Sequence, residues 1–133
     1  MQLFTVEQAN RTLPLVRRIV ADIVETYERW QGAVRAFELA SLEASGGEQS
    51  ADAAARQRDA ERLAEEIAGF VRELEAIGVE FKGYDVGLVD FPARLGDRTV
   101  YLCWRLGEPE VRYWHELNDG FAGRQPIEAL AFA

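Results

Sequence analysis

The sequence predicts an α+β fold in which a long antiparallel helical hairpin packs on a small antiparallel sheet of three or four strands. In the first half of the chain, apolar residues recur at alternating steps of three and four, which is the spacing of a heptad seam. After Gly78 the period changes to two, as in half-buried strands. We expect a single domain over residues 1–133, with the hairpin at 5–77, the sheet at 79–117 and an irregular tail at 118–133.

The first helix is expected to begin at a capping box. In Thr5-Val6-Glu7-Gln8, the threonine hydroxyl and the glutamine amide can satisfy two backbone amides of the first turn. Pro14 favours a second helix start at Thr12, with a bend near Leu13. The seam of the long helix that follows comprises Leu13, Val16, Val20, Ile23, Tyr27, Trp30, Val34 and Phe37.

A polar turn near residues 45–50, rich in Gly and Ser, separates the first helix from the second. The second helix starts at about Ala51, and Gly78 suits its left-handed C-terminal position. Its seam comprises Ala60, Leu63, Ile67, Phe70, Val71, Leu74 and Ile77. At 1.5 Å per residue the first helix would be on the order of 45 Å long, too long for the remaining residues to cover. We therefore expect the distal arm, which carries Trp30 and Phe37, to form a homodimer or a higher oligomer.

Four short strands are expected in the second half, joined by turns rich in Gly and Pro. The strands are Val79–Lys82, Gly87–Phe91, Thr99–Leu106 and Val111–Leu117, and the turns span 92–98 and 107–110.

The turn over 107–110 also predicts a register. A tight hairpin at this place pairs Cys103 with Trp114. In the same register His115 pairs with Leu102. Because side chains alternate between faces, Cys103 and His115 are expected on opposite faces of the sheet, which argues against a thiolate–imidazole site.

Asp90 and His115 are expected to flank the central strand near the same end. If Asp90 lies opposite Leu102, it shares a face with His115. If it lies opposite Tyr101, it shares a face with Glu116. In either register, the Asp90 carboxylate lies beside His115 and Glu116, which are adjacent in the sequence.

The candidate ligand-binding residues are therefore Asp90, His115, Glu116 and Arg124, and the first three are the candidate ligands of a divalent metal ion. A carboxylate could equally orient a general-base imidazole. Arg124, in the glycine-rich segment after the last strand, could bind a carboxylate or a phosphate. The competing interpretation is structural, with Asp90 capping a turn and His115 hydrogen-bonded within the fold.

Charge and composition restrict the possible partners. The net charge is −8 and the pI about 4.7, which weighs against nucleic-acid binding because phosphate neutralisation needs clustered Lys and Arg. No apolar run reaches the length of a membrane span, so we expect no membrane association. The single cysteine cannot form an internal disulfide and suits a reducing compartment, so we expect a cytoplasmic protein.

Several motifs carry a resemblance to a known family. FTVEQANRTLPLVRRI, GLVDFPA, VYLCWRLGE and YWHELNDGFAGRQPI resemble a small bacterial family of unknown function. The likeness covers both ends of the chain and most of its length, except the polar middle near residues 45–55. It implies a bacterial, cytosolic context and supplies no activity, cofactor or catalytic residue.

Two functional hypotheses follow from the sequence. The first is a small-ligand or divalent-metal site at the sheet edge, built from Asp90, His115, Glu116 and Arg124, in a protein whose enzymatic status stays open. The second is a structural or protein-interaction module that binds a protein partner through its helical arm. Clustered ionisable groups favour the first, whereas the plain heptads and the single histidine favour the second.

Overall fold

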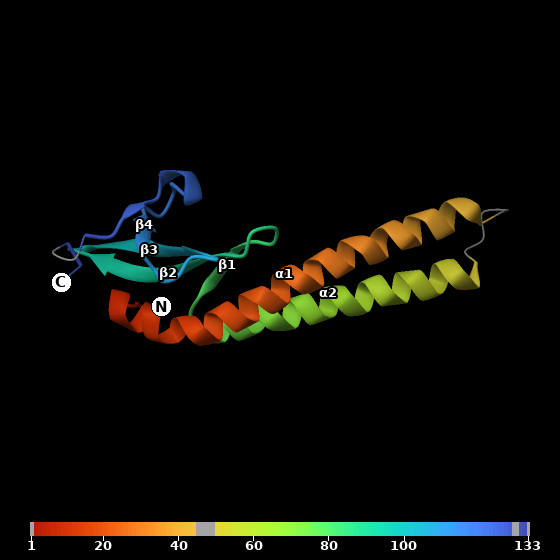
Figure 1. The fold of residues 1–133 in the computed structure, drawn as a ribbon, viewed down its shortest axis with the longest axis horizontal. Helices are drawn as coiled ribbons and strands as arrows, with labels where there is room; N and C mark the ends of the chain where they lie inside the picture. The colour runs from red at the N-terminus through yellow and green to blue at the C-terminus, as the bar shows by residue number, and fades with distance from the viewer. Residues whose placement is uncertain (1, 45–49, 129–130, 133) are drawn as a thin grey trace.

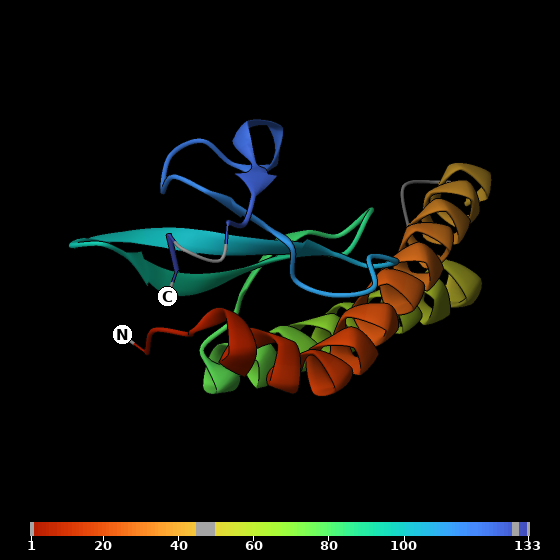
Figure 2. The same ribbon diagram turned by 60° about the vertical axis from the view of Figure 1, so that its left-hand side comes forward.

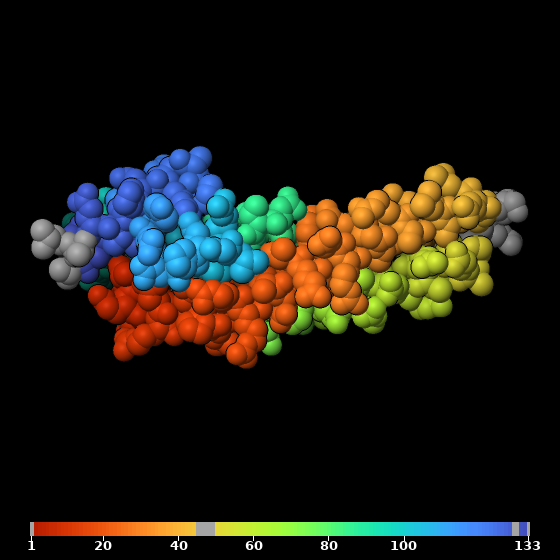
Figure 3. All heavy atoms as spheres, in the orientation of Figure 1, coloured from red at the N-terminus to blue at the C-terminus, as the bar shows by residue number. Residues whose placement is uncertain are grey.

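The α+β architecture is confirmed by a computed structural model, which describes residues 2–44, 50–128 and 131–132. Two long helices, α1 (Val6–Glu43) and α2 (Ala51–Ile77), pack against each other along their length. Figure 1 shows them as an antiparallel hairpin with the sheet at one end only. The far half of the hairpin projects beyond the sheet as an arm (Figure 3). The turn predicted near 45–50 includes residues 45–49, which lie outside the described residues.

The ends of the helices follow the predicted capping chemistry. The Thr5 hydroxyl accepts a hydrogen bond from the Gln8 amide at 3.0 Å, and the Gln8 side chain accepts one from the Thr5 amide at 2.9 Å. Ser50 caps α2 in the same way, by accepting from the Ala53 amide. Gly78 ends α2 in the left-handed conformation, with φ 96°.

The predicted second helix start at Thr12 is wrong, because α1 continues through Pro14. A proline inside a helix removes one backbone donor and costs about 3 kcal/mol. Leu13 and Val16, on either side of it, are both buried. Burial of an aliphatic side chain stabilises by about 1.5–3 kcal/mol, so the two together offset the cost of the proline.

Within the described residues the sheet is antiparallel, and its five strands follow the order of the chain. They are β1 (Glu80–Gly83), β2 (Leu88–Leu95), β3 (Arg98–Arg105), β4 (Tyr113–His115) and β5 (Gln125–Pro126). A short 3-10 helix, η1 (Phe121–Gly123), precedes β5. The segment after residue 118, expected to be irregular, therefore supplies one more short strand.

The turn predicted at 92–98 is wrong, because β2 runs on to Leu95, which pairs directly with Arg98. Pro92 is tolerated inside this strand because β1 pairs with β2 only as far as Asp90. Beyond that point the described residues place only Phe4 along this side of β2, through a single bridge to Ala93, and such an edge position does not need the missing amide. The Pro92 carbonyl accepts a hydrogen bond from the Phe4 amide at 2.7 Å.

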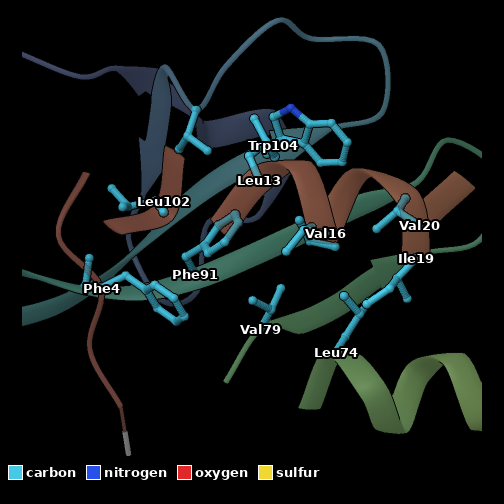
Figure 4. Packing of buried hydrophobic residues seen from close by; sticks show 14 of the residues in the cluster. Phe4, Leu13, Val16, Ile19, Val20, Leu74, Val79, Phe91, Leu102 and Trp104 are labelled. Atoms are coloured by element: carbon cyan, nitrogen blue, oxygen red, sulfur yellow. The ribbon is translucent and has the colours of Figure 1, made fainter. Parts of the chain in front are cut away.

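The core lies between the helices and one face of the sheet, where Phe91, Leu102 and Trp104 point toward α1 (Figure 4). A glycine permits the close approach of helix and sheet. Gly87 has φ 71°, and a Cβ at this position would lie 2.7 Å from a methyl carbon of Val20. The sheet face occupied by Val89, Phe91, Leu102 and Trp104 is therefore fixed against α1, and the alternate residues face away from the helices.

The C-terminal segment lies over the outer face of the sheet. Figure 2 shows the segment of η1 and β5, in blue, raised over the side of the sheet that is turned away from the helices. The protein thus has three layers: helices, sheet and the C-terminal segment. Neither helix in the described parts of the chain combines the length and the apolar character needed to cross a membrane.

Candidate metal centre

The predicted register between the third and fourth strands is wrong by one residue. The structure pairs Cys103 with Tyr113 and Tyr101 with His115. Cys103 and Tyr101 are two residues apart on one strand and point to the same face. Cys103 and His115 therefore lie on the same face of the sheet, contrary to the expectation from a tight turn.

The connection between β3 and β4 explains the shift, because it is an anchored loop and not a tight turn. Asn10 of α1 binds Val111 twice: its Oδ1 accepts from the Val111 amide at 2.7 Å, and its Nδ2 donates to the Val111 carbonyl at 3.4 Å. The Trp104 indole donates to the Glu108 carbonyl at 3.1 Å. These bonds hold the loop against the helix, so that pairing with β3 begins only at Tyr113.

Three side chains of different chemistry meet on the outer face. Asp90 of β2 lies directly opposite Cys103 of β3, and His115 of β4 reaches toward both. A carboxylate oxygen, the cysteine sulfur and a ring nitrogen all lie within 4.8 Å of one another. The exposed fractions of Asp90, Cys103 and His115 are 3%, 0% and 2%. We call these three residues the triad.

The hydrogen bonds of His115 determine its protons. Its Nδ1 lies 2.7 Å from the carbonyl oxygen of Glu116, which can only accept, so Nδ1 carries a hydrogen. Its Nε2 lies 3.0 Å from the Asp90 Oδ1. Two lone pairs at that distance would repel, so one further proton lies between Nε2 and Oδ1. The carbonyl also fixes the ring so that Nε2 faces the other two residues, as in protein metal sites.

The environment disfavours charge on the other two members of the triad. Burial raises the pKa of Asp90, and the hydrogen bond with His115 offsets this only in part. Burial, reinforced by the nearby Asp90, raises the pKa of the Cys103 thiol to about 11. In the absence of a cation, Cys103 therefore carries its proton at neutral pH.

Arg124 reaches the triad from the loop after η1. Its Nη1 lies 3.8 Å from the Cys103 sulfur, and its guanidinium forms a two-pronged ion pair with Glu108. Burial alone would lower the pKa of Arg124, but the hydrogen bond to Glu108 outweighs it and the net shift is upward. Burial likewise opposes ionisation of Glu108, yet the bonds from Arg124 and the Arg105 amide lower its pKa. Both groups are therefore charged.

Glu116 contributes its backbone but not its side chain. The carboxylate turns away and pairs with Arg98 at 2.8 Å on the exposed surface. The structure thus brings together Asp90 and His115 of the sequence-predicted set and places Arg124 beside Cys103. The position expected for the Glu116 carboxylate is taken by the Cys103 sulfur.

On the side of the triad opposite Arg124, Tyr101 contacts the His115 ring at 5.5 Å between centroids. Its hydroxyl donates to the Glu80 carboxylate at 2.9 Å. Burial, together with Glu80, raises the pKa of Tyr101 to about 12. Tyr101 is therefore a neutral hydrogen-bond donor at this flank of the site.

Cys103 is a member of the site that was not predicted from the sequence, although the sequence holds a signal for it. Trp104 and Trp114 are both large apolar residues and both pack on the core side of the sheet. If both tryptophans are assigned to the core face, alternation places Cys103 and His115 together on the outer face. The apolar faces predict the register better here than the length of the connecting loop.

The family comparison covers the whole of this site. Residues 2–127 match the family model described as Uncharacterized conserved protein (DUF2203). No curated protein and no solved structure matches the chain. The match spans the greater part of the chain, including both helices, the sheet and the triad. The chain belongs to the DUF2203 family.

Proposed function

We propose that the protein binds one divalent metal ion, with zinc the first to test, through Asp90, Cys103 and His115. The observation that supports this is the meeting of a carboxylate oxygen, a thiol sulfur and an imidazole nitrogen within 4.8 Å of one another. These are the three donor types that zinc takes from proteins. A thiolate ligand disfavours magnesium and calcium, which prefer oxygen.

The charges of such a site balance. A divalent cation bound by the Asp90 carboxylate, the Cys103 thiolate and a neutral His115 has no net charge. The neighbouring Arg124–Glu108 pair is neutral as well. This matters because a net charge in a site as buried as this one would be strongly destabilising.

Three protein ligands leave one position on a tetrahedral ion, as in zinc sites that bind water or a substrate. In this proposal a water or a small ligand takes that position, which joins the metal hypothesis to the small-ligand hypothesis. A free cysteine that serves as a ligand suits a reducing compartment, so we propose a cytoplasmic location.

Elemental analysis of the purified protein, followed by titration of metal-free protein with Zn²⁺ and Co²⁺, tests the proposal. We expect one ion per chain and loss of binding in Cys103→Ser and Asp90→Asn. Glu116→Gln is the matched comparison, because this carboxylate pairs with Arg98 outside the triad. Binding that survives Cys103→Ser but is lost in both Asp90→Asn and Glu116→Gln would restore the ligand set expected from the sequence. No binding to the wild-type protein would refute the metal site.

A second candidate function concerns the arm. Near the end of α1, Leu39 and Leu42 are 61% and 82% exposed, one helical turn apart. We propose that a second copy of the chain covers them, since the arm projects away from the rest of the molecule (Figure 1). Trp30, which the sequence analysis assigned to this contact, packs within the chain. It stacks on Tyr27 and lines a cleft of about 320 Å³ together with Tyr27, Ala64, Ile67 and Tyr84.

A further inference from the structure

We infer that Arg124 is a positioning residue for the Cys103 ligand, an inference that rests on the proposed metal site. The Arg124 Nη1 lies 3.8 Å from the Cys103 sulfur, within the range of an N–H···S hydrogen bond. The bond runs from the loop after η1 to the central strand β3. Arg124 therefore acts on the metal ion through the sulfur and not as a ligand.

Two aromatic rings and one carboxylate hold the Arg124 guanidinium in place. Its carbon lies 3.9 Å from the centre of the Tyr113 ring and 4.5 Å from that of the Phe121 ring. Glu108 accepts from the guanidinium through both carboxylate oxygens, one from Nη2 and the other from the same Nη1 that contacts the sulfur. A long, flexible side chain is thus fixed before any ion binds, so the bond to sulfur requires little further ordering.

A bond of this kind changes the sulfur itself. Donation from a cationic group stabilises the lone pairs of a thiolate and draws electron density away from the ion. Partners that orient or polarise a metal ligand commonly change metal affinity by about 10- to 100-fold. The Arg124 contact supplies such a partner to Cys103, as the Glu116 carbonyl does to His115.

Replacing Arg124 also removes packing over the sheet, so stability alone cannot distinguish a positioning role from a structural one. The thiolate-to-cobalt charge-transfer band of the Co²⁺-loaded protein reports the sulfur directly. Without the hydrogen bond the sulfur lone pairs rise in energy, and the band moves to longer wavelength. Arg124→Gln removes the cation, whereas Arg124→Lys keeps one that can still donate to the sulfur.

We expect Arg124→Gln to weaken Co²⁺ and Zn²⁺ binding about 10- to 100-fold and to shift the band to longer wavelength. Arg124→Lys should recover part of both effects. Arg112→Gln is the control, because Arg112 pairs with Glu110 on the exposed surface. It should leave the band and the affinity unchanged.

The outcomes distinguish a failure of the Arg124 positioning role from a failure of the proposed metal site. If the wild-type protein gives a cobalt–thiolate band that Cys103→Ser abolishes and Arg124→Gln leaves unmoved, the positioning role is refuted and the metal site stands. If the wild-type protein takes up no ion, both are refuted. A shift of the band in Arg112→Gln equal to that in Arg124→Gln would also refute the role, because it would reflect a general charge effect.

Discussion

The His115 Nε2 lies 3.0 Å from the Asp90 Oδ1, a contact that joins β4 to β2 across the outer face of β3. Neighbouring strands are about 4.8 Å apart, so the two side chains meet above the strand between them. On that strand, Cys103 lies opposite Asp90 and Tyr101 lies opposite His115. The position of the proton shared by Asp90 and His115 is therefore also next to a sulfur, and a metal ion there would displace that proton.

Asp90→Asn should separate metal binding from folding. An asparagine amide can donate to the Nε2 of a neutral His115, so the buried contact survives without a charge. We expect the free energy of unfolding of the metal-free protein to change by less than about 1 kcal/mol and Zn²⁺ binding to fall at least about 100-fold. Chemical denaturation and metal titration measure the two effects. A variant that unfolds readily yet binds Zn²⁺ with unchanged affinity would show that Asp90 is a structural residue only.

Asn10 should control the register of the site from a distance. Asn10→Ala leaves the Val111 amide and carbonyl without their partners, which costs about 1–3 kcal/mol of stability. Because these bonds delay the start of β4, we also expect weaker metal binding through a less well fixed His115. Asn10→Asp keeps the acceptor for the Val111 amide but turns a carboxylate oxygen toward the Val6 and Val111 carbonyls, so it should destabilise at least as much as Asn10→Ala. Wild-type metal affinity in Asn10→Ala would show that the loop does not set the geometry of the triad.

Gly87 and Gly96 form a matched pair for the packing of the sheet on α1. Both have positive φ, 71° and 63°, so alanine is strained by about 1 kcal/mol at either position. A Cβ at Gly87 would also meet Val20 and Leu106 at 2.7 and 2.9 Å, whereas one at Gly96 would meet nothing within 4 Å. We therefore expect Gly87→Ala to lower the free energy of unfolding by about 2 kcal/mol more than Gly96→Ala. Equal losses in thermal or chemical unfolding would mean that the helix–sheet contact adapts freely.

Leu42→Glu tests the proposed contact between arms. The side chain is 82% exposed, so the substitution should not disturb the fold of one chain. We expect the wild-type protein to be at least dimeric in light scattering, and Leu42→Glu to shift it toward the monomer. Leu117→Glu, at an exposed leucine near the sheet, is the control. A wild-type protein that is monomeric at tens of micromolar would remove the proposal.

The helices and the fold class could be predicted because their signals are local. The capping box at Thr5 and the left-handed end at Gly78 depend on residues within a few positions of one another. The heptad seam likewise predicts the buried face of α1 near the sheet, but in the arm the buried residues are small ones just before the seam positions, among them Ala33 and Ala40. Pro14 and Pro92 misled the prediction because each normally breaks a regular element, and only tertiary contacts show why these two are tolerated.

Only part of the candidate site could be predicted, because which residues meet there depends on the register of the strands. Asp90 and His115 were expected to meet, and they do, although in neither of the two registers considered. Cys103 was excluded, and the Glu116 side chain included, by a single-residue error that reverses every face of β4 relative to β3. The cause is the bond between Asn10 and Val111, which are 101 residues apart. No local pattern encodes that contact, and only the apolar face shared by Trp104 and Trp114 signals the register that it sets.

Proton release on zinc binding tests the central claim most directly. Binding to the triad displaces the proton shared by Asp90 and His115 and the thiol proton of Cys103, whose pKa of about 11 keeps it bound at neutral pH. Titration calorimetry in buffers of different ionisation enthalpy should therefore show about two protons released per ion, and the affinity should rise about 100-fold per pH unit near neutrality. Any residual Zn²⁺ binding by Cys103→Ser or Asp90→Asn, measured at high ion concentration, should release fewer protons per ion. Zinc binding without proton release, or with a release that neither variant changes, would contradict the account.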